Sequence, residues 1–302
     1  MAPRVSVIVT AYNAAAHLGE AIQSLLAQTF TDLEVIVVDD YSTDSTRELL
    51  AAIDDPRLVV LHHEVNEGPF VAANRGLDVA RGAFIARLDA DDRARPERLQ
   101  RELAYLDAHS DVGIVGTAYE VIDDAGRTER VVPMPVTDLE IRWQSLLHSP
   151  FLHSSVLMRR ELLRKHHLVY DPDLRAGGDY ELWPRLLPHT HAHNLDEPLT
   201  QFRVWSGSIS STSRAAQRAI HDEVAFRTVS TVLPDLKLGQ EEVTSLRQLV
   251  LGEAASRPVG ERRRLAQEYC SLFTAFARGH KGSPDLPALS ARVASAAETW
   301  AR

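Results

Sequence analysis

The sequence is poor in cysteine and in long apolar segments. Its one cysteine, Cys270, cannot form a disulfide within the chain or complete a cysteine-rich zinc site, so nothing indicates an oxidising compartment. No window approaches the about 18 consecutive apolar residues of a membrane-spanning helix, and the amino terminus lacks a long hydrophobic segment with a cleavage site. We therefore expect a cytoplasmic protein without a transmembrane segment, in contact with a membrane at most peripherally.

Basic residues are scarce relative to acidic ones. The 33 Lys and Arg residues against 42 Asp and Glu residues give a formal net charge of -9, which argues against a nucleic-acid partner. The chain has 302 residues, of which 44% are hydrophobic, so it can bury a sizeable core. One large α/β domain with an appendage, or two modest domains, would fit this length.

Short hydrophobic segments alternate with helix-type patterns in the first part of the chain. Strands are predicted at residues 5–10, 34–38, 58–61, 84–88 and 112–117, with helices at 18–26, 44–50, 71–79 and from 95. A hairpin is predicted around the turn at 123–126. This alternation predicts an α/β fold with a mostly parallel sheet flanked by helices, in which right-handed crossovers bring the carboxyl ends of the strands to one edge. Tyr12, Asp40 and Asp89 should therefore converge there.

The second part of the chain is organised differently. From residue 214 onward the hydrophobic spacing is helical, interrupted by Pro234, Gly239 and Pro258. We predict an α/β domain at 1–213, with halves at 1–118 and 119–213, and a helical carboxy-terminal subdomain at 214–302. We expect the helical subdomain to offer a surface through which copies of the chain could form a homo-oligomer.

Three carboxylates follow the predicted strand at 84–88, in the segment Asp89-Ala90-Asp91-Asp92. Carboxylates crowded at a strand end repel one another, so the cluster suits a divalent cation that faces a negatively charged ligand such as phosphate. The alternative is a solvated acidic turn, because an acidic chain contains such triplets by chance.

Six segments form an ordered set of motifs. They are VSVIVTAYN at 5–13, VVDDYSTDST at 37–46, NEGPFVAANRG at 66–76, DADD at 89–92, AGGDYELWPRL at 176–186 and FRVWSGSIS at 202–210. The set resembles the inverting family 2 glycosyltransferases, which have a Rossmann-like nucleotide-diphospho-sugar fold of the GT-A type. The resemblance covers about residues 4–212 and implies transfer of a sugar from a nucleotide-sugar, here a UDP-sugar, to an acceptor hydroxyl. It also implies that residues 1–118 are the nucleotide-binding half of the domain and that residues 119–213 are the acceptor-binding half.

The resemblance also implies roles for individual residues. Mn²⁺ or Mg²⁺ would be held by Asp91 with help from Asp89. The nucleotide-sugar would contact Thr10, Ala11, Tyr12, Asp40, Asn74, Asp89, Ala90 and Arg203. From the residues alone, Tyr12 offers an aromatic face to a nucleobase or caps the core, and Asp40 caps the following helix. The resemblance implies instead that Asp40 accepts a uracil N–H.

The base that deprotonates the acceptor would be Asp179, which is also a sound N-cap for the following helix. Two residues depart from the family pattern. Gly178 replaces the acid that precedes the base, and Trp205 stands where a His often does, which leaves Arg203 as the candidate contact for the diphosphate. These departures keep a non-catalytic nucleotide-sugar-binding or assembly protein open as an alternative.

The acceptor side is the least specified part of the site. His153, Trp183 and Trp205 are candidates for it, and a glycan, a lipid-linked, protein or small-molecule acceptor would all be compatible. The Gln201-Phe202-Arg203-Val204-Trp205 segment lacks the QxxRW spacing of processive polysaccharide synthases. We therefore expect a single transfer in each catalytic cycle.

Overall fold

The computed structural model describes residues 2–207 and 214–302, which fall into two compact units. The first contains residues 1–136 and 151–214, and the second contains residues 137–150 and 215–302. The second unit thus includes a segment that the sequence prediction placed in the acceptor-binding half. Ser208 and Ser210 of the last motif lie outside the described residues.

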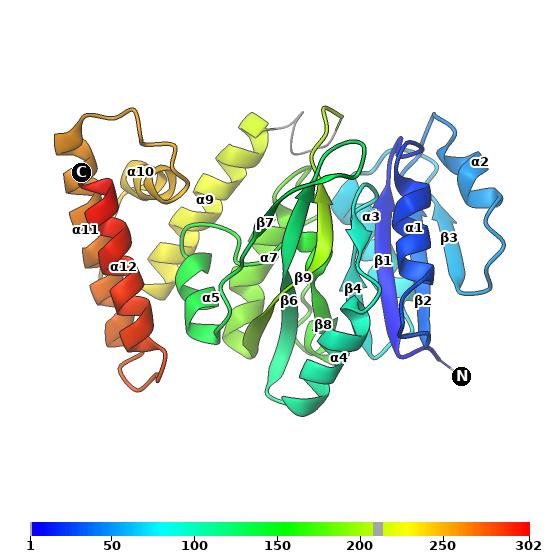
Figure 1. Cartoon of the computed structure of the whole chain (residues 1–302), viewed down its shortest axis with the longest axis horizontal. Coiled ribbons are helices and arrows are strands. Elements are labelled where there is room, and N and C mark those ends of the chain that lie inside the picture. The colour runs from blue at the N-terminus through cyan, green and yellow to red at the C-terminus, as the bar shows by residue number, and fades with distance from the viewer. Residues whose placement is uncertain (1, 208–213) are drawn as a thin grey trace. The chain divides into compact units, whose positions relative to one another are not determined.

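The first unit is built on one sheet (Figure 1). Its strands are β1 (Val5–Ala11), β2 (Leu33–Asp39), β3 (Leu58–His62), β4 (Phe84–Arg87), β5 (Arg93–Ala94), β6 (Val112–Ile122), β7 (Thr128–Val132), β8 (Leu157–Arg159) and β9 (His191–Arg203). Its α-helices are α1 (Leu18–Leu26), α2 (Thr46–Ala51), α3 (Pro69–Val79), α4 (Arg98–Ala108), α6 (Arg160–Lys165) and α7 (Gly178–Leu186), with short 3₁₀ helices at His153–Ser155 and Leu187–His189.

The strand order is β3-β2-β1-β4-β8-β6-β9-β5, and β7 pairs with β6. Strands β3, β2, β1 and β4 are mutually parallel, as are β6 and β9, whereas β8 runs antiparallel to both β4 and β6. The predicted α/β class with a mixed, mostly parallel sheet is confirmed. The antiparallel strand β8 joins the two parallel sections, and β5 and β7 are antiparallel to their partners β9 and β6.

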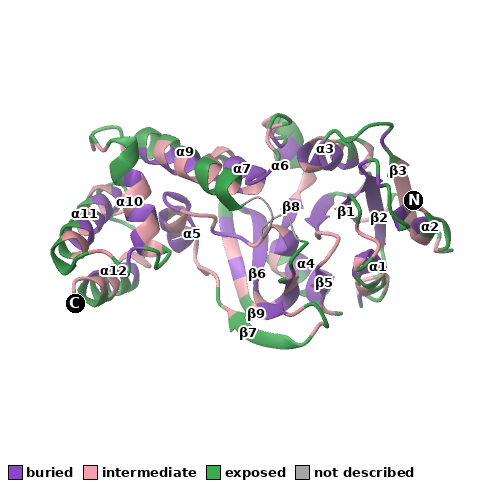
Figure 2. Ribbon diagram, turned by 90° about the horizontal axis from the view of Figure 1, so that it is seen from above, coloured by how far each residue is buried: buried purple, intermediate pink, exposed green. Residues whose placement is uncertain are grey.

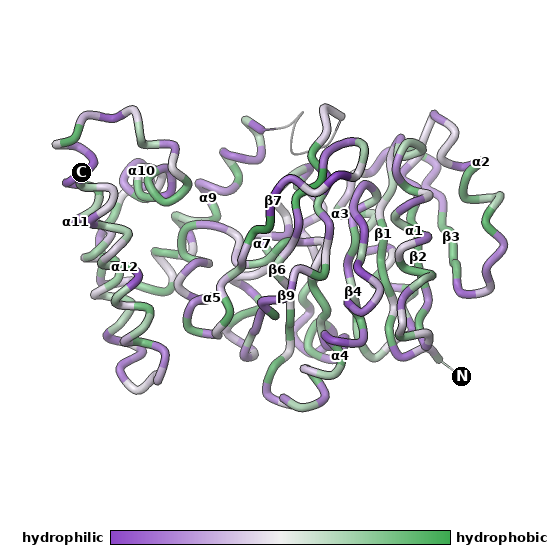
Figure 3. The backbone as a smooth tube through the Cα atoms, in the orientation of Figure 1, coloured by the Kyte–Doolittle hydropathy of each residue, from purple (hydrophilic) through white to green (hydrophobic). Residues whose placement is uncertain are grey.

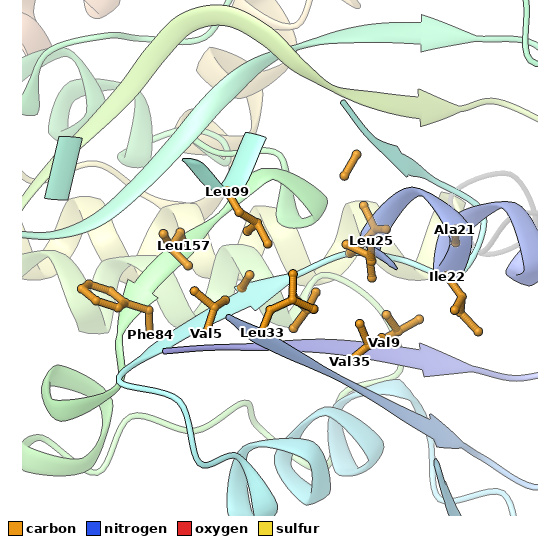
Figure 4. Close-up of a cluster of buried hydrophobic side chains, with 14 of the residues drawn as sticks. Val5, Val9, Ala21, Ile22, Leu25, Leu33, Val35, Phe84, Leu99 and Leu157 are labelled. Carbon is orange, nitrogen blue, oxygen red and sulfur yellow. The ribbon is translucent and has the colours of Figure 1, made fainter. Parts of the chain in front are cut away.

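Helices cover both faces of this sheet. In Figure 2, α1 and α4 lie on one face, and α3, α6 and α7 lie on the other. The face under α1 and α4 holds a buried cluster in which Val5 and Val9 of β1 meet Ile22 and Leu25 of α1 (Figure 4). Strands that are covered on both faces need apolar residues at nearly every position, which is why β1 and β2 are almost continuously hydrophobic.

Two predicted boundaries were wrong. The strand expected at 112–117 continues to Ile122, because its second half is buried and paired with both β7 and β9. The first strand of the predicted hairpin is therefore the end of β6. Helix α2 begins at Thr46, with Ser45 as its N-cap residue, one position later than the predicted N-cap Asp44. The Asp44 carboxylate nevertheless accepts the backbone N–H of Thr46 at 3.0 Å, so it still satisfies a donor at this helix end.

The second unit consists of helices. They are α5 (Asp138–Ser145), α9 (Arg214–Val232), α10 (Gln240–Val250), α11 (Val259–Arg278) and α12 (Leu286–Trp300). Figure 3 shows green and purple alternating along α11 and α12, as amphipathic helices require. Trp143 of α5 is buried among Tyr269, Phe273 and Phe276 of α11 and donates its indole N–H to the Tyr269 hydroxyl at 3.1 Å. Within the described ranges, no helix combines the length and apolar character needed to cross a bilayer.

Candidate functional site

The carboxyl ends of β1, β2 and β4 lie at one edge of the sheet. The parallel register pairs Ala11 with Asp39 and Ile8 with Arg87, so the segments that follow these three strands leave the sheet on the same side. Tyr12, Asp40 and Asp89 occupy those segments. The predicted convergence of these residues on one edge is confirmed.

Asp89 is held by a buried cation and a histidine. Its Oδ1 lies 3.3 Å from Arg87 Nη2 and 3.5 Å from His153 Nδ1, and its N–H donates to the Ser154 hydroxyl at 3.0 Å. Burial alone would raise the pKa of Asp89, but His153 and Arg87 outweigh it and hold the pKa well below its usual range. Asp89 is therefore a stable anion at neutral pH.

The other two acids of the turn, Asp91 and Asp92, have raised pKa values, so their anionic forms are less favourable than that of Asp89. Burial raises the pKa of Asp91, and the charge of Asp89 adds to the rise, although the Trp205 N–H opposes it. Burial also raises the pKa of Asp92 well above its usual range, with contributions from the charges of Asp91 and Asp89. Asp92 is inaccessible to solvent and accepts the Arg203 backbone N–H at 2.8 Å. This hydrogen bond holds the acidic turn against the end of β9.

The donor set of this turn suits a divalent cation that also binds phosphate. Among the described residues, no three His, Cys, Asp or Glu side chains are arranged to form a complete metal site. Mg²⁺ is commonly held by one or two carboxylates together with substrate phosphates rather than by an all-protein cage. Asp89 and Asp91 are half-buried and two residues apart, close enough for the charge of Asp89 to act on Asp91. A bound cation would relieve this repulsion.

Asp40 connects the ends of β2 and β3. Its carboxylate is buried, accepts the backbone N–H groups of Glu67 at 2.9 Å and Gly68 at 2.8 Å, and lies 2.9 Å from His63 Nδ1. Asp40 does not cap α2, which begins six residues later. A carboxylate oxygen can accept two hydrogen bonds, so Oδ2, with Gly68 as its one described partner, retains capacity for another donor.

Tyr12 extends from the end of β1 with 52% of its surface exposed, so it does not cap the core. The next residue, Asn13, has φ 48° and ties the β1 loop to the β2 loop: its N–H donates to Ser42 Oγ at 2.9 Å, and its Oδ1 accepts the Thr43 N–H at 2.8 Å. Thr10 is half-buried, with Arg87 3.5 Å from its hydroxyl, and Ala11 is buried.

Asn74 has a structural partner. Its side-chain amide donates to the Tyr170 carbonyl at 2.8 Å, and its Oδ1 accepts the Tyr170 N–H at 3.0 Å. Phe70, from the same helix, stacks on the Tyr170 ring at 5.6 Å. These contacts attach α3 to the segment that precedes α7.

Asp179 lies in the first turn of α7, after Gly177 in the left-handed conformation at φ 67°. Its half-buried carboxylate makes no hydrogen bond or ion pair with any residue that the structure describes. Burial raises the pKa of Tyr170 above its usual range; Arg87 opposes this, and the charges of both Asp179 and Asp89 add to it. Asp179 and Asp89 therefore act on the same phenol, although 90 positions separate them in the chain.

Two residues that were predicted to contact ligands, Arg203 and Trp183, are buried by neighbouring residues instead. Arg203 is 1% exposed, and its guanidinium donates to Glu20 at 2.6 Å and to the carbonyls of Asp91 and Asp124, so it has no exposed surface for a diphosphate. Trp183 is completely buried and packs edge-on against Phe151. Burial of this kind depends on tertiary packing, which local sequence does not reveal.

The sequence profile described as "Glycosyl transferase family 2" matches residues 6–166. The chain belongs to this family. It is therefore a glycosyltransferase, and the region that matches contains the acidic turn, Tyr12 and Asp40.

Individual relatives agree with this assignment. An uncharacterized glycosyltransferase of Haemophilus influenzae is 28% identical over 254 residues, which span 81% of this chain and 79% of the relative. TarS of S. aureus, solved in complex with UDP-GlcNAc, superimposes with a TM-score of 0.65 at 20% identity, covering 99% of this chain and 90% of that structure. The mannosyltransferase PcManGT of Pyrobaculum calidifontis, in complex with GDP-Man and Mn²⁺, gives 0.56 at 20% identity, covering 100% and 84%. These structures share the fold of this family 2 chain.

Gly178, the departure from the family pattern beside Asp179, is explained by packing. A Cβ atom at this position would lie 2.8 Å from the Phe70 ring, closer than real Cβ contacts. Phe70 and its stacking partner Tyr170 thus occupy the space that a side chain at position 178 would need. The family 2 acid at this position is replaced by an aromatic contact.

We expect Gly178→Ala to lower the free energy of unfolding by about 1–3 kcal/mol, the usual effect of overpacking. Urea denaturation measures this directly. Gly260→Ala is the matched control, because Gly260 also lies in the first turn of a helix but has no atom within 4 Å of an added Cβ. It should be neutral or slightly stabilising. Equal effects of the two substitutions would contradict the packing explanation.

Two residues of the site escaped the sequence analysis. Arg87 is 1% exposed, donates to the Ile8 carbonyl at 2.9 Å and contacts Asp89, and Tyr170 lies 2.9 Å from His153 Nε2 through its hydroxyl. Arg87 carried one usable signal, since an arginine in an otherwise apolar strand must have a buried partner. Tyr170 carried none, because its segment contains no motif.

Proposed function

We propose that this glycosyltransferase moves a sugar from a UDP-sugar to an acceptor hydroxyl with inversion of the anomeric carbon, using Mn²⁺ or Mg²⁺ and one transfer per cycle. The observation that carries the proposal is a series of contacts from the acidic turn towards Asp179. His153 lies 3.5 Å from Asp89 and 2.9 Å from the Tyr170 hydroxyl, and Phe70, which stacks on Tyr170, lies against Gly178, the residue before Asp179. These contacts support a site in which the carboxylates of the acidic turn and the Asp179 carboxylate, which has no partner among the described residues, serve the same reaction centre.

The donor half would consist of the edge formed by β1, β2 and β4. The exposed Tyr12 ring offers a face for the nucleobase, and the remaining capacity of Asp40 Oδ2 suits the imide N–H of uracil. Asp91 and Asp89 would hold the divalent cation. When bound, the cation would offset the charge that develops on the departing nucleoside diphosphate.

The acceptor half would depend on Asp179. An unpartnered, half-buried carboxylate can accept a proton from the attacking hydroxyl, whereas a carboxylate engaged in an ion pair would first have to lose its partner. Attack of that hydroxyl on the anomeric carbon, opposite to the departing diphosphate, forms the new glycosidic bond and inverts the configuration. His153 lies beside Asp89 and is the remaining candidate on the acceptor side.

A thermal-shift panel tests the donor assignment. We expect UDP with Mn²⁺ to raise the melting temperature more than GDP, dTDP or Mn²⁺ alone, because ligands that bind only the folded state stabilise it by mass action. GDP belongs in the panel because the structural neighbours include a GDP-Man complex as well as a UDP-GlcNAc complex. A larger shift with GDP would overturn the uracil role of Asp40.

The alternative of a non-catalytic nucleotide-sugar-binding protein rests on the loss of the family acid at Gly178, and the family 2 match argues against it. Slow hydrolysis of the UDP-sugar in the presence of Mn²⁺ distinguishes the two. Tight binding without turnover in both the wild type and Asp179→Asn would favour the binding protein.

A further inference from the structure

Trp205 reaches back from the end of β9 to the acidic turn. Its indole N–H donates to Asp91 Oδ2 at 2.8 Å. An indole nitrogen can donate one hydrogen bond but can neither accept one nor ligate a metal. The indole N–H can therefore act on Asp91 by donating a hydrogen bond, and the ring can act on its neighbours by packing.

The indole ring is fixed by its neighbours. The His17 ring meets it edge-on, with centroids 5.0 Å apart at 78°, and His17 Nε2 lies 3.0 Å from Asp124 Oδ1. Gly207 lies close against the six-membered ring, since a Cβ there would be 2.2 Å from Cζ3. The His17 ring from the segment before α1 and the backbone of Gly207, two residues after Trp205, therefore set the direction of the N–H.

The segment that carries Trp205 is itself anchored to the turn. Two residues earlier, the Arg203 N–H donates to Asp92 Oδ1 at 2.8 Å and its Nε donates to the Asp91 carbonyl at 2.9 Å. The backbone of the turn and the Asp91 side chain are thus held by the same short stretch after β9. Asp91 could move relative to Trp205 only if these two hydrogen bonds of Arg203 were also broken.

The chemical nature of the contact matters as much as its position. Asp91 lies near the Asp89 charge, which disfavours a second anion and would push the two carboxylates apart. A Lys or Arg partner would restrain Asp91 but would also neutralise it and compete with a cation. The neutral N–H of Trp205 restrains one oxygen, leaves the negative charge in place, and leaves Oδ1 without a partner from any other described residue.

We propose that Trp205 is a positioning residue that orients Asp91 as a ligand for the divalent cation through its indole N–H, without touching the cation. The inference rests on the proposed metal-dependent function. Hydrogen bonds that orient metal-ligating carboxylates in this way commonly contribute 10–100-fold to metal affinity. The family motif at 202–210 does not imply this role, because Trp205 departs from the family pattern there.

The test is a titration of Mn²⁺ followed by electron paramagnetic resonance, with UDP at saturation, on the wild type, Trp205→Phe and Trp300→Phe. We expect Trp205→Phe to weaken Mn²⁺ binding by about 10–100-fold. Trp300→Phe makes the same chemical change in α12 of the second unit and should leave the affinity unchanged. UDP binding without metal, measured by calorimetry, should be the same in all three proteins.

A second pair of variants isolates the hydrogen bond if Trp205→Phe does not fold. Gln and Met have side chains of similar length, but only Gln donates an N–H, so Trp205→Gln should bind Mn²⁺ more tightly than Trp205→Met. Equal affinities in this pair, unchanged affinity in Trp205→Phe, or a parallel loss of metal-free UDP binding would overturn the inference. Failure of the wild type to bind Mn²⁺ with UDP would instead overturn the metal dependence on which the inference rests.

Discussion

Asp179→Asn is expected to lower the rate of sugar transfer by about 10²–10⁴-fold, the usual contribution of a general base. Asn is nearly isosteric with Asp and is tolerated in a first helical turn, so α7 should persist. The acceptor hydroxyl would then attack without a group to receive its proton. The rate constant kcat, measured with a UDP-sugar and an accepted sugar, should carry the loss, while donor binding measured by calorimetry should not change.

Glu181→Gln is the matched control for this prediction. Glu181 lies two residues further along α7, and both of its carboxylate oxygens share the Arg185 Nε–H at 3.0 Å, so this carboxylate is already engaged. We expect this variant to transfer sugar at close to the wild-type rate. If the two substitutions reduced kcat equally, Asp179 would have no special role as the base.

Asp91→Asn is expected to abolish the stimulation of donor binding by Mn²⁺ and to lower transfer by about a thousandfold. The change removes a charge from the proposed metal ligand while it preserves the shape of the turn. A cation that stabilises developing charge contributes several kcal/mol, and each 1.36 kcal/mol corresponds to about tenfold in rate. Calorimetric titration of UDP with and without Mn²⁺ measures the first effect, and product formation measures the second.

Asp123→Asn provides the comparison for Asp91→Asn. Asp123 lies in the turn between β6 and β7, where its carboxylate bonds the exposed Arg127 at 2.7 Å. The Asp123→Asn variant should retain both the stimulation of donor binding by Mn²⁺ and the wild-type rate of sugar transfer. Persistence of Mn²⁺ stimulation in Asp91→Asn would place the cation on other residues.

The strands and helices of the nucleotide-binding half could be predicted because their causes are local. β1 and β2 are short β-branched segments, and α1 has apolar residues at helical spacing, so each element is indicated within its own residues. The boundaries were harder. The extension of β6 to Ile122 depends on β7 and β9, which flank it in the sheet but not in the sequence.

The candidate site was predictable to the extent that parallel topology follows from alternating strands and helices. That topology places Tyr12, Asp40 and Asp89 on one edge whatever the details of packing. The choice between alternatives for each residue was not predictable. Tyr12 is exposed and not a core cap, and Asp40 bonds the segment after β3 and not α2, because neighbours from other strands decide both.

The sequence alone predicts the α/β class, the family motifs and the placement of Asp40 and Asp89 at one edge of the sheet. The structure adds that Arg203 is buried and bonded to the acidic turn, that Trp205 bonds Asp91, and that the Phe70 ring takes the space beside Gly178. The physical reason is that a buried polar group must be satisfied by whatever the fold brings next to it. Arg203 meets Glu20 across 183 positions of the chain, a pairing that no local pattern contains.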